Sequence, residues 1–539
     1  MMHALLNSLA IWHNPVFHRF RRSQLRFRSS LFWLLATLII TTFVIALTHI
    51  VQTSGYVALP VEQAARNQWL PLLIIQGLIL LIKGTGKTSA GLIQDKIEQT
   101  LDYQRLTPVK PLRNIVGYLF GLPILEYAMF ALTLPHLAFV VIVGNIPLTS
   151  VLSVYVAFFT CAIFYHTTAI AVAMVMKRWV LGYLLSIFSV AALNLVIAPL
   201  GSQLGIKFLQ YLSVYPIFGQ EVLPLMGGGG PNLLRFADQV PFFEWSLSPF
   251  IFTLLLQCGL IATFTTMVIR RWQKASKHSL SKFYSLGILV AFITLFAGNL
   301  WPVITGDSLP FPIFGTQSLS AISNEIAVFL PLIYAGAIWL LCIFLFSNTV
   351  PNHHAYIRGV RRAIKLGRKR ALPWEDDSAN IPFMCLFIAI AVAGFAFIAG
   401  EMNQAGFNNT IEAGEHFTRW RLPLALTLVL LSTLLMLQVL QNRGSVLVGL
   451  LVWTLPLLIM IVSIAANEGL TTAFAMIASI SPIAFLIMTG LLPIDMVVQM
   501  GPNEDFNAVN IGAQTGLALI TLQIAILSWR WLQLRTRLH

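Results

Sequence analysis

Twelve long runs of apolar residues recur along the chain, and polar or charged segments separate them. The runs cover residues 31–50, 68–84, 114–141, 150–176, 179–199, 247–269, 284–303, 325–347, 382–400, 421–440, 445–466 and 511–530. A run of about 20 apolar residues matches the ~30 Å of hydrocarbon in a bilayer. Backbone groups in lipid need partners within the same segment, so each run is predicted to be a helix. We expect an all-α integral membrane protein with about twelve transmembrane helices.

A further apolar stretch, 471–493, is interrupted by Ser481-Pro482 and by Pro493. It is either a thirteenth span or a re-entrant hairpin that enters and leaves on the outer side. Lys and Arg gather on the cytoplasmic side of membrane proteins. With both termini in the cytoplasm and a hairpin at 471–493, only five of the 34 Lys and Arg face outward, namely Arg66, Lys207, Arg235, Arg419 and Arg421. This distribution favours the hairpin and a multi-pass protein of the plasma (inner) membrane.

The predicted topology repeats once, which divides the chain into six-span halves at 1–282 and 283–539. Each half has two spans, a basic cytoplasmic stretch (85–113 or 348–381), and three further spans. An irregular outer region and a final span complete each half; the region 200–246 is expected to hold short interfacial helices. Parallel repeats are common in transporters. The alternative is that any twelve-span chain divides at six.

Composition supports this class: 57% of the residues are apolar and only 10% are charged, against roughly 25% charged in soluble proteins. The formal charge of +14 follows from membrane orientation and contact with anionic headgroups, so no nucleic-acid partner is expected. All four cysteines fall in apolar runs, where their spacing fits neither a metal site nor a disulfide framework.

Residues 84–88 read Gly-Thr-Gly-Lys-Thr, like the end of a phosphate-binding loop. The full motif needs a glycine where this chain has Leu81, and a strand before it. The segment is instead expected to be a flexible exit from the second span, with Lys83 and Lys87 reaching toward phosphate headgroups.

The stretch 89–111 is charged and amphipathic. Its apolar residues recur at helical spacing, with acidic residues elsewhere on the helical wheel; the apolar set is Leu92, Ile93, Ile97 and Leu101, and the acidic set is Asp95, Glu98 and Asp102. Thr107-Pro108 is predicted to end the helix. We expect a short helix in the membrane plane at the cytoplasmic surface, and the plainest alternative is an interfacial helix without a partner.

Several of these residues resemble permeases of the ABC-2 type. The matching features are Glu98 before Thr100-Leu101, the step Leu106-Thr107-Pro108, the glycines Gly117 and Gly121 of the next span, and the entry segment Asn14-Pro15-Val16-Phe17. The resemblance covers roughly 10–270. In the second half only the topology and Ser481-Pro482 match, and the basic stretch 358–370 lacks the Thr-Pro step.

The resemblance implies the membrane-spanning permease subunit of an ABC transporter, expected to be an exporter, and not itself an enzyme. ATP and magnesium would bind a separate ATPase subunit. The chain would act as a homodimer or hold both halves in one polypeptide. The residues expected to couple it to the ATPase are Asp95, Glu98, Thr100, Asp102, Arg105, Thr107 and Pro108.

Glu126 and His166 are ionisable groups inside predicted spans, which makes them functional candidates. As a pair they would relay protons in a proton- or ion-coupled secondary transporter, the alternative function. They would equally serve as a hydrogen-bonded packing pair. A membrane-embedded lipid or polysaccharide enzyme is a third class, but the clustered acidic and basic residues that it needs at one membrane face do not occur.

Overall fold

The computed structural model describes residues 11–54, 58–199, 206–226, 239–273, 278–305, 319–351, 353–368, 372–378, 381–404, 415–439, 453–456, 458, 472–491 and 504–536. The chain forms two compact units. Unit 1 comprises Met1–Ser202, Ile206–Pro241 and Trp245–Lys277, and unit 2 comprises Gln203–Gly205, Phe242–Glu244 and His278–His539. Whether these units are two repeated six-helix halves stays a prediction.

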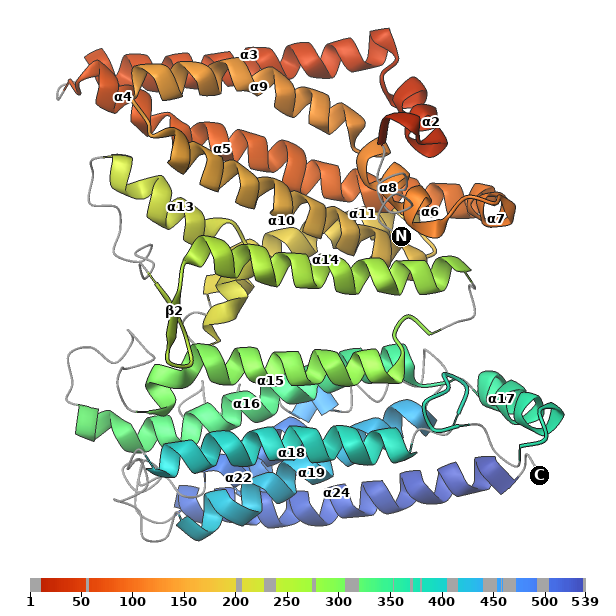
Figure 1. The fold of residues 1–539 in the computed structure, drawn as a ribbon. Coiled ribbons are helices and arrows are strands. Elements are labelled where there is room, and N and C mark those ends of the chain that lie inside the picture. Colours follow the sequence, from red (N-terminus) through yellow and green to blue (C-terminus); the bar gives the residue numbers. More distant parts are fainter. Residues whose placement is uncertain are drawn as a thin grey trace. The chain divides into compact units, whose positions relative to one another are not determined.

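Unit 1 is built from helices, drawn from red to green in Figure 1. They are η1 (Ile11–His13), α2 (Pro15–Gln24), α3 (Phe27–Ser54), α4 (Val61–Asn67), α5 (Trp69–Gly77), the π-helical η2 (Leu78–Gly84), α6 (Thr85–Ile97), α7 (Thr100–Leu106), α8 (Pro111–Gly121), α9 (Ile124–Val143), α10 (Leu148–Val175), α11 (Trp179–Ala192), the π-helical η3 (Leu193–Ile197), η4 (Lys207–Leu212), α13 (Tyr215–Glu221), η5 (Leu223–Met226) and α14 (Pro249–Gln273). A two-stranded sheet of β1 (Val240–Phe242) and β2 (Trp245–Leu247) precedes α14.

The described helices of unit 2 are α15 (Lys282–Ile304), α16 (Leu319–Thr349), α17 (His353–Lys365), α18 (Ile381–Gln404), α19 (Glu415–Val439), α21 (Thr472–Ala478), α22 (Pro482–Leu491) and α24 (Glu504–Thr536). Helix α17 is short and basic, and its exposed residues include Arg361, Arg362 and Lys365. It lies within the predicted basic stretch 348–381.

Among the described residues, eleven helices are long and apolar enough to cross a membrane. Each overlaps one of the predicted runs, which confirms the helical membrane class. Most of the remaining run, 445–466, lies outside the described residues. The largest difference is at the second run, where one continuous helix extends over Val61–Ile97.

The described part of the stretch 471–493, residues 472–491, forms two short helices, α21 and α22, which run in opposite directions along α24. Ala475 of α21 and Met488 of α22 both lie against Gly512, whereas Ser479 and Phe485 lie against the next turn of α24, at Thr515 and Gly516. The chain therefore advances along α24 in α21 and returns in α22. Whether the stretch 471–493 is a re-entrant hairpin or a thirteenth span stays a prediction.

The predicted third span, 114–141, is divided into α8 and α9. Pro123 precedes the first residue of α9, where its ring prevents the helix of α8 from continuing. Glu126 consequently lies in the first turn of α9, and not at the middle of one unbroken helix as its position in the run implied. Only α9 is long and apolar enough to span.

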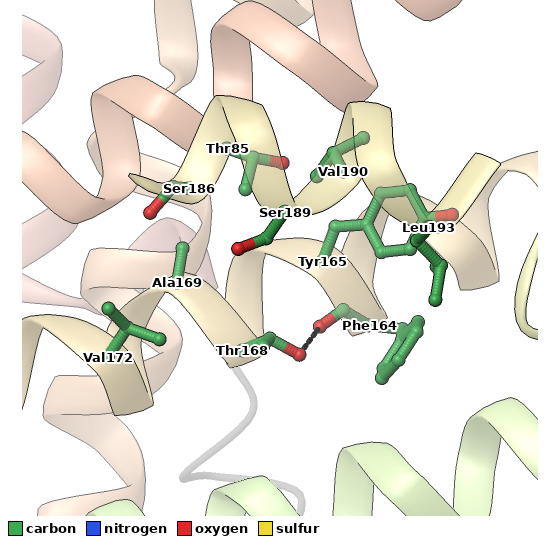
Figure 2. A pocket seen from close by; sticks show the side chains of 10 residues that line it. All are labelled: Thr85, Phe164, Tyr165, Thr168, Ala169, Val172, Ser186, Ser189, Val190 and Leu193. Carbon is green, nitrogen blue, oxygen red and sulfur yellow. Dashed lines mark hydrogen bonds between the residues drawn. The ribbon is translucent and has the colours of Figure 1, made fainter. Parts of the chain in front are cut away.

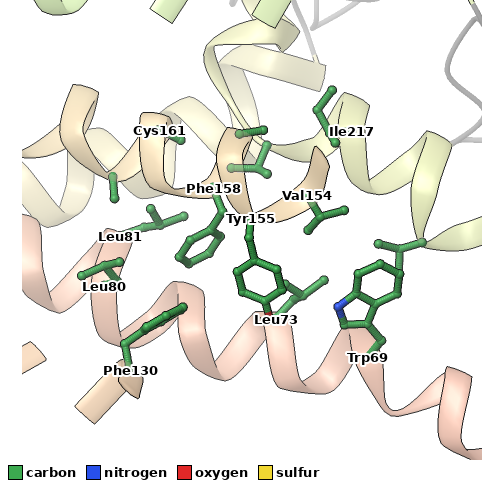
Figure 3. Packing of buried hydrophobic residues seen from close by; sticks show 14 of the residues in the cluster. Trp69, Leu73, Leu80, Leu81, Phe130, Val154, Tyr155, Phe158, Cys161 and Ile217 are labelled. Carbon is green, nitrogen blue, oxygen red and sulfur yellow. The ribbon is translucent and has the colours of Figure 1, made fainter. Parts of the chain in front are cut away.

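The core of unit 1 is a cluster of aromatic and aliphatic side chains from α5, η2, α9, α10 and α13 (Figure 3). Trp69, Phe158 and Ile217 are fully buried within it. Ile217 comes from the segment 200–246, which was predicted to lie on the outer side and whose described residues form η4, α13, η5, β1 and the start of β2. The predicted short helices are present there, and α13 packs on the core of the unit.

Candidate functional site at one end of unit 1

The last turns of α6, α10 and α14 meet at one end of unit 1. Lys96 at the end of α6 donates hydrogen bonds to the backbone oxygens of Met174 and Met176, at 2.8 and 3.0 Å. These carbonyls close the C-terminal end of α10, where a helix leaves acceptors without partners and favours a cation. The ammonium group of Lys96 therefore joins the ends of two long helices.

The segment predicted to be a single in-plane helix is two elements. Residues up to Ile97 continue the second spanning helix, because the small residues Gly84 and Gly86 let it pack closely on His166 and Tyr183. The predicted flexible exit at 84–88 is therefore wrong. Gln99 then adopts φ 60°, a left-handed conformation that ends a helix, and α7 begins at Thr100. It ends at Leu106, before the Thr107-Pro108 step that was predicted to break it.

Helix α7 follows α6 (Figure 1), and its side chains are buried on one side and exposed on the other. Leu101 is buried in a cluster with Leu92 and Ile93, whereas Tyr103 and Leu106 are 72% and 84% exposed. Arg105 binds Asp102 at 2.6 Å, and it donates to the backbone oxygen of Arg271 in the last turn of α14 at 3.3 Å. Arg105 thereby links α7 to the end of α14.

The other predicted coupling residues lie in α7 or directly beside it in sequence. Glu98 is exposed and accepts a hydrogen bond from Gln94. Thr100 is half-buried, Thr107 donates to the backbone oxygen of Gln104, and Pro108 is exposed. The predicted apolar stripe holds for Leu92, Ile93 and Leu101 but not for Ile97, which is 55% exposed. The exposed surface therefore mixes charged and apolar side chains.

Asp95 lies in the protein interior, unlike the expectation that its carboxylate faces a partner. It pairs with the guanidinium of Arg19 from α2, and it accepts a hydrogen bond from the hydroxyl of Tyr118 at 2.6 Å. Tyr118 lies in α8, outside the candidate spans. Burial, together with the adjacent Asp95 carboxylate, raises the pKa of this phenol well above its usual range, so Tyr118 remains a donor. Asp95 is thus a structural link between α6, α2 and α8.

The first turn of α2 is capped by Asn14, which helps to position Arg19 of the same helix beside Asp95. The side-chain oxygen of Asn14 accepts hydrogen bonds from Val16 and Phe17, at 3.0 and 3.4 Å, which satisfies the first free backbone donors of the helix. A Cβ atom at Gly117 of α8 would lie 2.7 Å from both Asn14 and Val16. The glycine is therefore required for the close approach of α2 to α8.

A second polar group lies between α3, η2 and α9. Lys83 is 3.5 Å from a carboxylate oxygen of Glu126, which is 1% exposed. The same ammonium lies 4.1 Å from the ring centre of Trp33 and 3.4 Å from the sulfur of Met129. A cation above an indole face is attracted by the ring quadrupole. Lys83 thus contacts Glu126 and Trp33. The sequence had instead predicted that its side chain reaches toward phosphate headgroups.

His166 does not meet Glu126 directly. Its Nε2 atom lies 3.1 Å from the backbone oxygen of Leu80, and its Nδ1 atom lies 3.3 Å from the hydroxyl of Tyr127. Leu80 belongs to the π-helical segment η2, and π-helical turns occur frequently at functional sites. The two candidates therefore belong to adjacent contacts, Glu126 with Lys83 and His166 with η2.

A mostly apolar cavity of about 130 Å³ lies among α6, α10, α11 and η3 (Figure 2). Figure 2 shows Thr85, Tyr165 and Ser189 around it, and the hydroxyl of Thr168 bonded to the backbone oxygen of Phe164. In the described part of the chain, no three His, Cys, Asp or Glu side chains gather in a way that would hold a metal ion.

Comparison of the chain with protein-family models, with curated proteins and with solved structures finds no match. The functional argument accordingly depends on the residues of this chain and on the geometry of this end of unit 1.

Proposed function

We propose that the chain is the membrane-spanning permease subunit of an ABC transporter, an exporter driven by a separate ATPase subunit. The observation that carries the proposal is α7, a short helix with an open surface whose anchors lie on the ends of the spanning helices. Its resemblance to the coupling segment of ABC-2 permeases supplies the class of partner.

The contacts around α7 explain how motion would pass into the membrane. Arg105 holds α7 to the end of α14, and Leu101 packs in the cluster that contains residues of α6 and α10. At the end of α6, Lys96 holds α10, and Asp95 holds α2 and α8. A force on α7 therefore acts on five helices at once. Such chains of packed side chains and ion pairs are physical carriers of coupling.

The chain leaves ATP chemistry to its partner in this proposal. Residues 84–88, which resemble part of a phosphate-binding loop, lie in a continuous helix, so their backbone N–H groups are used in helical hydrogen bonds and do not cradle a phosphate. ATP and magnesium would bind the ATPase subunit, which would dock on Glu98, Asp102, Tyr103 and Leu106 at the cytoplasmic face.

The test is site-specific photocrosslinking in the cells that produce the protein. A photoreactive amino acid replaces Tyr103, and the crosslinked peptide is identified by mass spectrometry. The matched control is Trp245, which is 73% exposed and lies just before the other end of α14. We expect a crosslink from position 103, and not from 245, to a protein with a complete phosphate-binding loop.

Two outcomes contradict the proposal. One is a purified chain that hydrolyses ATP without a partner, at a rate that Asp102→Lys does not change. The other is transport that persists fully in a Glu98→Lys/Asp102→Lys/Tyr103→Ala variant whose thermal stability equals that of the parent. Either result would remove the division of labour or the role of α7.

Lys83 and Glu126 favour one alternative, a proton- or ion-coupled secondary transporter, because a buried ion pair in a spanning region marks transport pathways. The two functions respond differently to energy sources. ATP depletion at constant proton gradient stops an ABC transporter, whereas dissipation of the gradient at constant ATP stops the alternative. Glu126→Gln is expected to abolish only the second activity.

A further inference from the structure

A basic hollow of about 720 Å³ lies along α2 and the two residues that follow it. The hollow is shallow and open along one side. The residues that line it are Pro15, His18, Arg19, Arg21, Arg22, Ser23 and Arg26. Four guanidinium groups thus gather within eight residues of sequence, and each offers a planar pair of donors that fits phosphate oxygens.

The described part of the chain provides little negative charge for this hollow. Arg19 uses one edge for Asp95 and lies 4.6 Å from the ring centre of Phe20, which fixes its position. The side chains of Arg21, Arg22 and Arg26 are exposed, and no described carboxylate forms an ion pair with them. Cations held this close together repel one another unless an anion lies between them.

The hollow adjoins an apolar surface. Helix α3 begins at Phe27, directly after Arg26, and exposed apolar side chains follow along it, including Phe32, Ile39 and Phe43. A ligand that satisfies both surfaces has a phosphate-bearing head and long apolar tails. Clusters of basic residues beside a membrane helix bind anionic lipids for this reason.

We propose that this hollow binds the headgroup of an anionic phospholipid with more than one negative charge, whose acyl chains lie along α3. The inference is independent of the proposed transport function, because it uses only α2 and α3. Bound lipid would hold α2 at the membrane surface, and α2 in turn holds Asp95 at the end of α6. The lipid is therefore a structural ligand of the end that carries α7.

The test measures lipid binding to the full chain in detergent by native mass spectrometry. Three probes are compared: cardiolipin, phosphatidylcholine and inorganic phosphate. The variant Arg21→Gln/Arg22→Gln/Arg26→Gln removes the unpaired cations and leaves the buried Phe17 and Phe20 in place. The control Arg361→Gln/Arg362→Gln/Lys365→Gln removes the same charge from α17. Each arginine is expected to contribute about a fivefold change in affinity, or roughly 100-fold for three.

We expect the parent chain to bind one cardiolipin selectively over phosphatidylcholine. The α2 variant should lose that binding roughly 100-fold, and the α17 control should keep it. Arg21→Lys/Arg22→Lys/Arg26→Lys retains the charge and should retain part of the affinity, which separates the effect of the charge from that of replacing the three side chains. Equal loss in both glutamine variants would overturn the site. Displacement of the lipid by millimolar phosphate would also overturn it, because the ligand would then be a free anion.

Discussion

Removal of the Asp95 carboxylate is expected to destabilise unit 1 by a calculable amount. Asp95→Ala loses the hydrogen bond from Tyr118 to a charged acceptor, worth about 1.5–3 kcal/mol. It also loses the pair with Arg19, whose side chain is 40% exposed, and solvent limits that contribution to about 1 kcal/mol. The free energy of unfolding should therefore fall by about 3 kcal/mol.

Two milder variants divide this effect. Asp95→Asn keeps an oxygen that accepts from Tyr118 and should cost about 1–2 kcal/mol. Arg19→Gln removes only the partly exposed partner and should cost about 1 kcal/mol. In the double variant Arg19→Gln/Asp95→Asn, the two costs should fail to add by about 1 kcal/mol, the coupling energy of the pair.

The cysteines provide a reporter of unfolding that is specific to unit 1. Cys161 and Cys342 are buried, whereas Cys258 and Cys385 are exposed. In a Cys258→Ser/Cys342→Ala/Cys385→Ser background, only Cys161 in α10 reacts with a thiol reagent when unit 1 opens. Denaturant titrations of each variant then give free energies by linear extrapolation. An Asp95→Ala variant within 0.5 kcal/mol of its parent would refute the assignment of Asp95 as a structural link.

Three further changes test other contacts. Lys83→Met leaves Glu126 buried without its cation and should cost about 3–5 kcal/mol, which Lys83→Met/Glu126→Gln should largely restore in the same thiol assay. Gln76→Leu removes the partner of the Thr133 and Tyr155 hydroxyls, both within 2.8 Å, and should cost about 1–3 kcal/mol; Gln76→Glu should cost more, because it buries a charge. Gly117→Val places extra atoms in the contact of α2 with α8 and should lower the free energy of unfolding by about 1–3 kcal/mol. Limited proteolysis should therefore cut the N-terminal segment faster in this variant than in the control Gly287→Val, whose added Cβ meets no atom within 4 Å.

Hydrophobic runs were sufficient to locate the spanning helices, because lipid imposes both their length and their helical hydrogen bonding. They were not sufficient to locate helix ends inside the protein. The second run was expected to end near residue 84, yet the helix continues to Ile97 because Gly86 and Gly91 permit close contact with Tyr183 and Leu122. Such contacts depend on neighbours that are distant in sequence.

The sequence predicted those features of the candidate site that depend on neighbouring residues, and it did not predict the contacts between distant ones. The end of α7 at Thr107-Pro108 and the burial of Leu101 follow from local sequence. Asp95 was assigned to the charged face, although it stands three residues after Leu92 and therefore near the apolar stripe. Its partners Arg19 and Tyr118 are 76 and 23 residues away in sequence. A single sequence offers no signal for either pairing.

The π-helical segment η2 determines where the second spanning helix tolerates a change in length. Each residue of an α-helix advances the chain by about 100°, whereas a π-helical turn has i→i+5 hydrogen bonds and therefore holds more residues per turn. Deleting one residue within 78–84 would close η2 to an ordinary α-helical turn with little rotation of the residues beyond it, so Asp95 would stay near Arg19 and Lys96 near the end of α10. The same deletion in the α-helical part, after Thr85, would rotate both residues by about 100°. Related chains should therefore differ in length by one residue at η2 more readily than elsewhere in the second spanning helix.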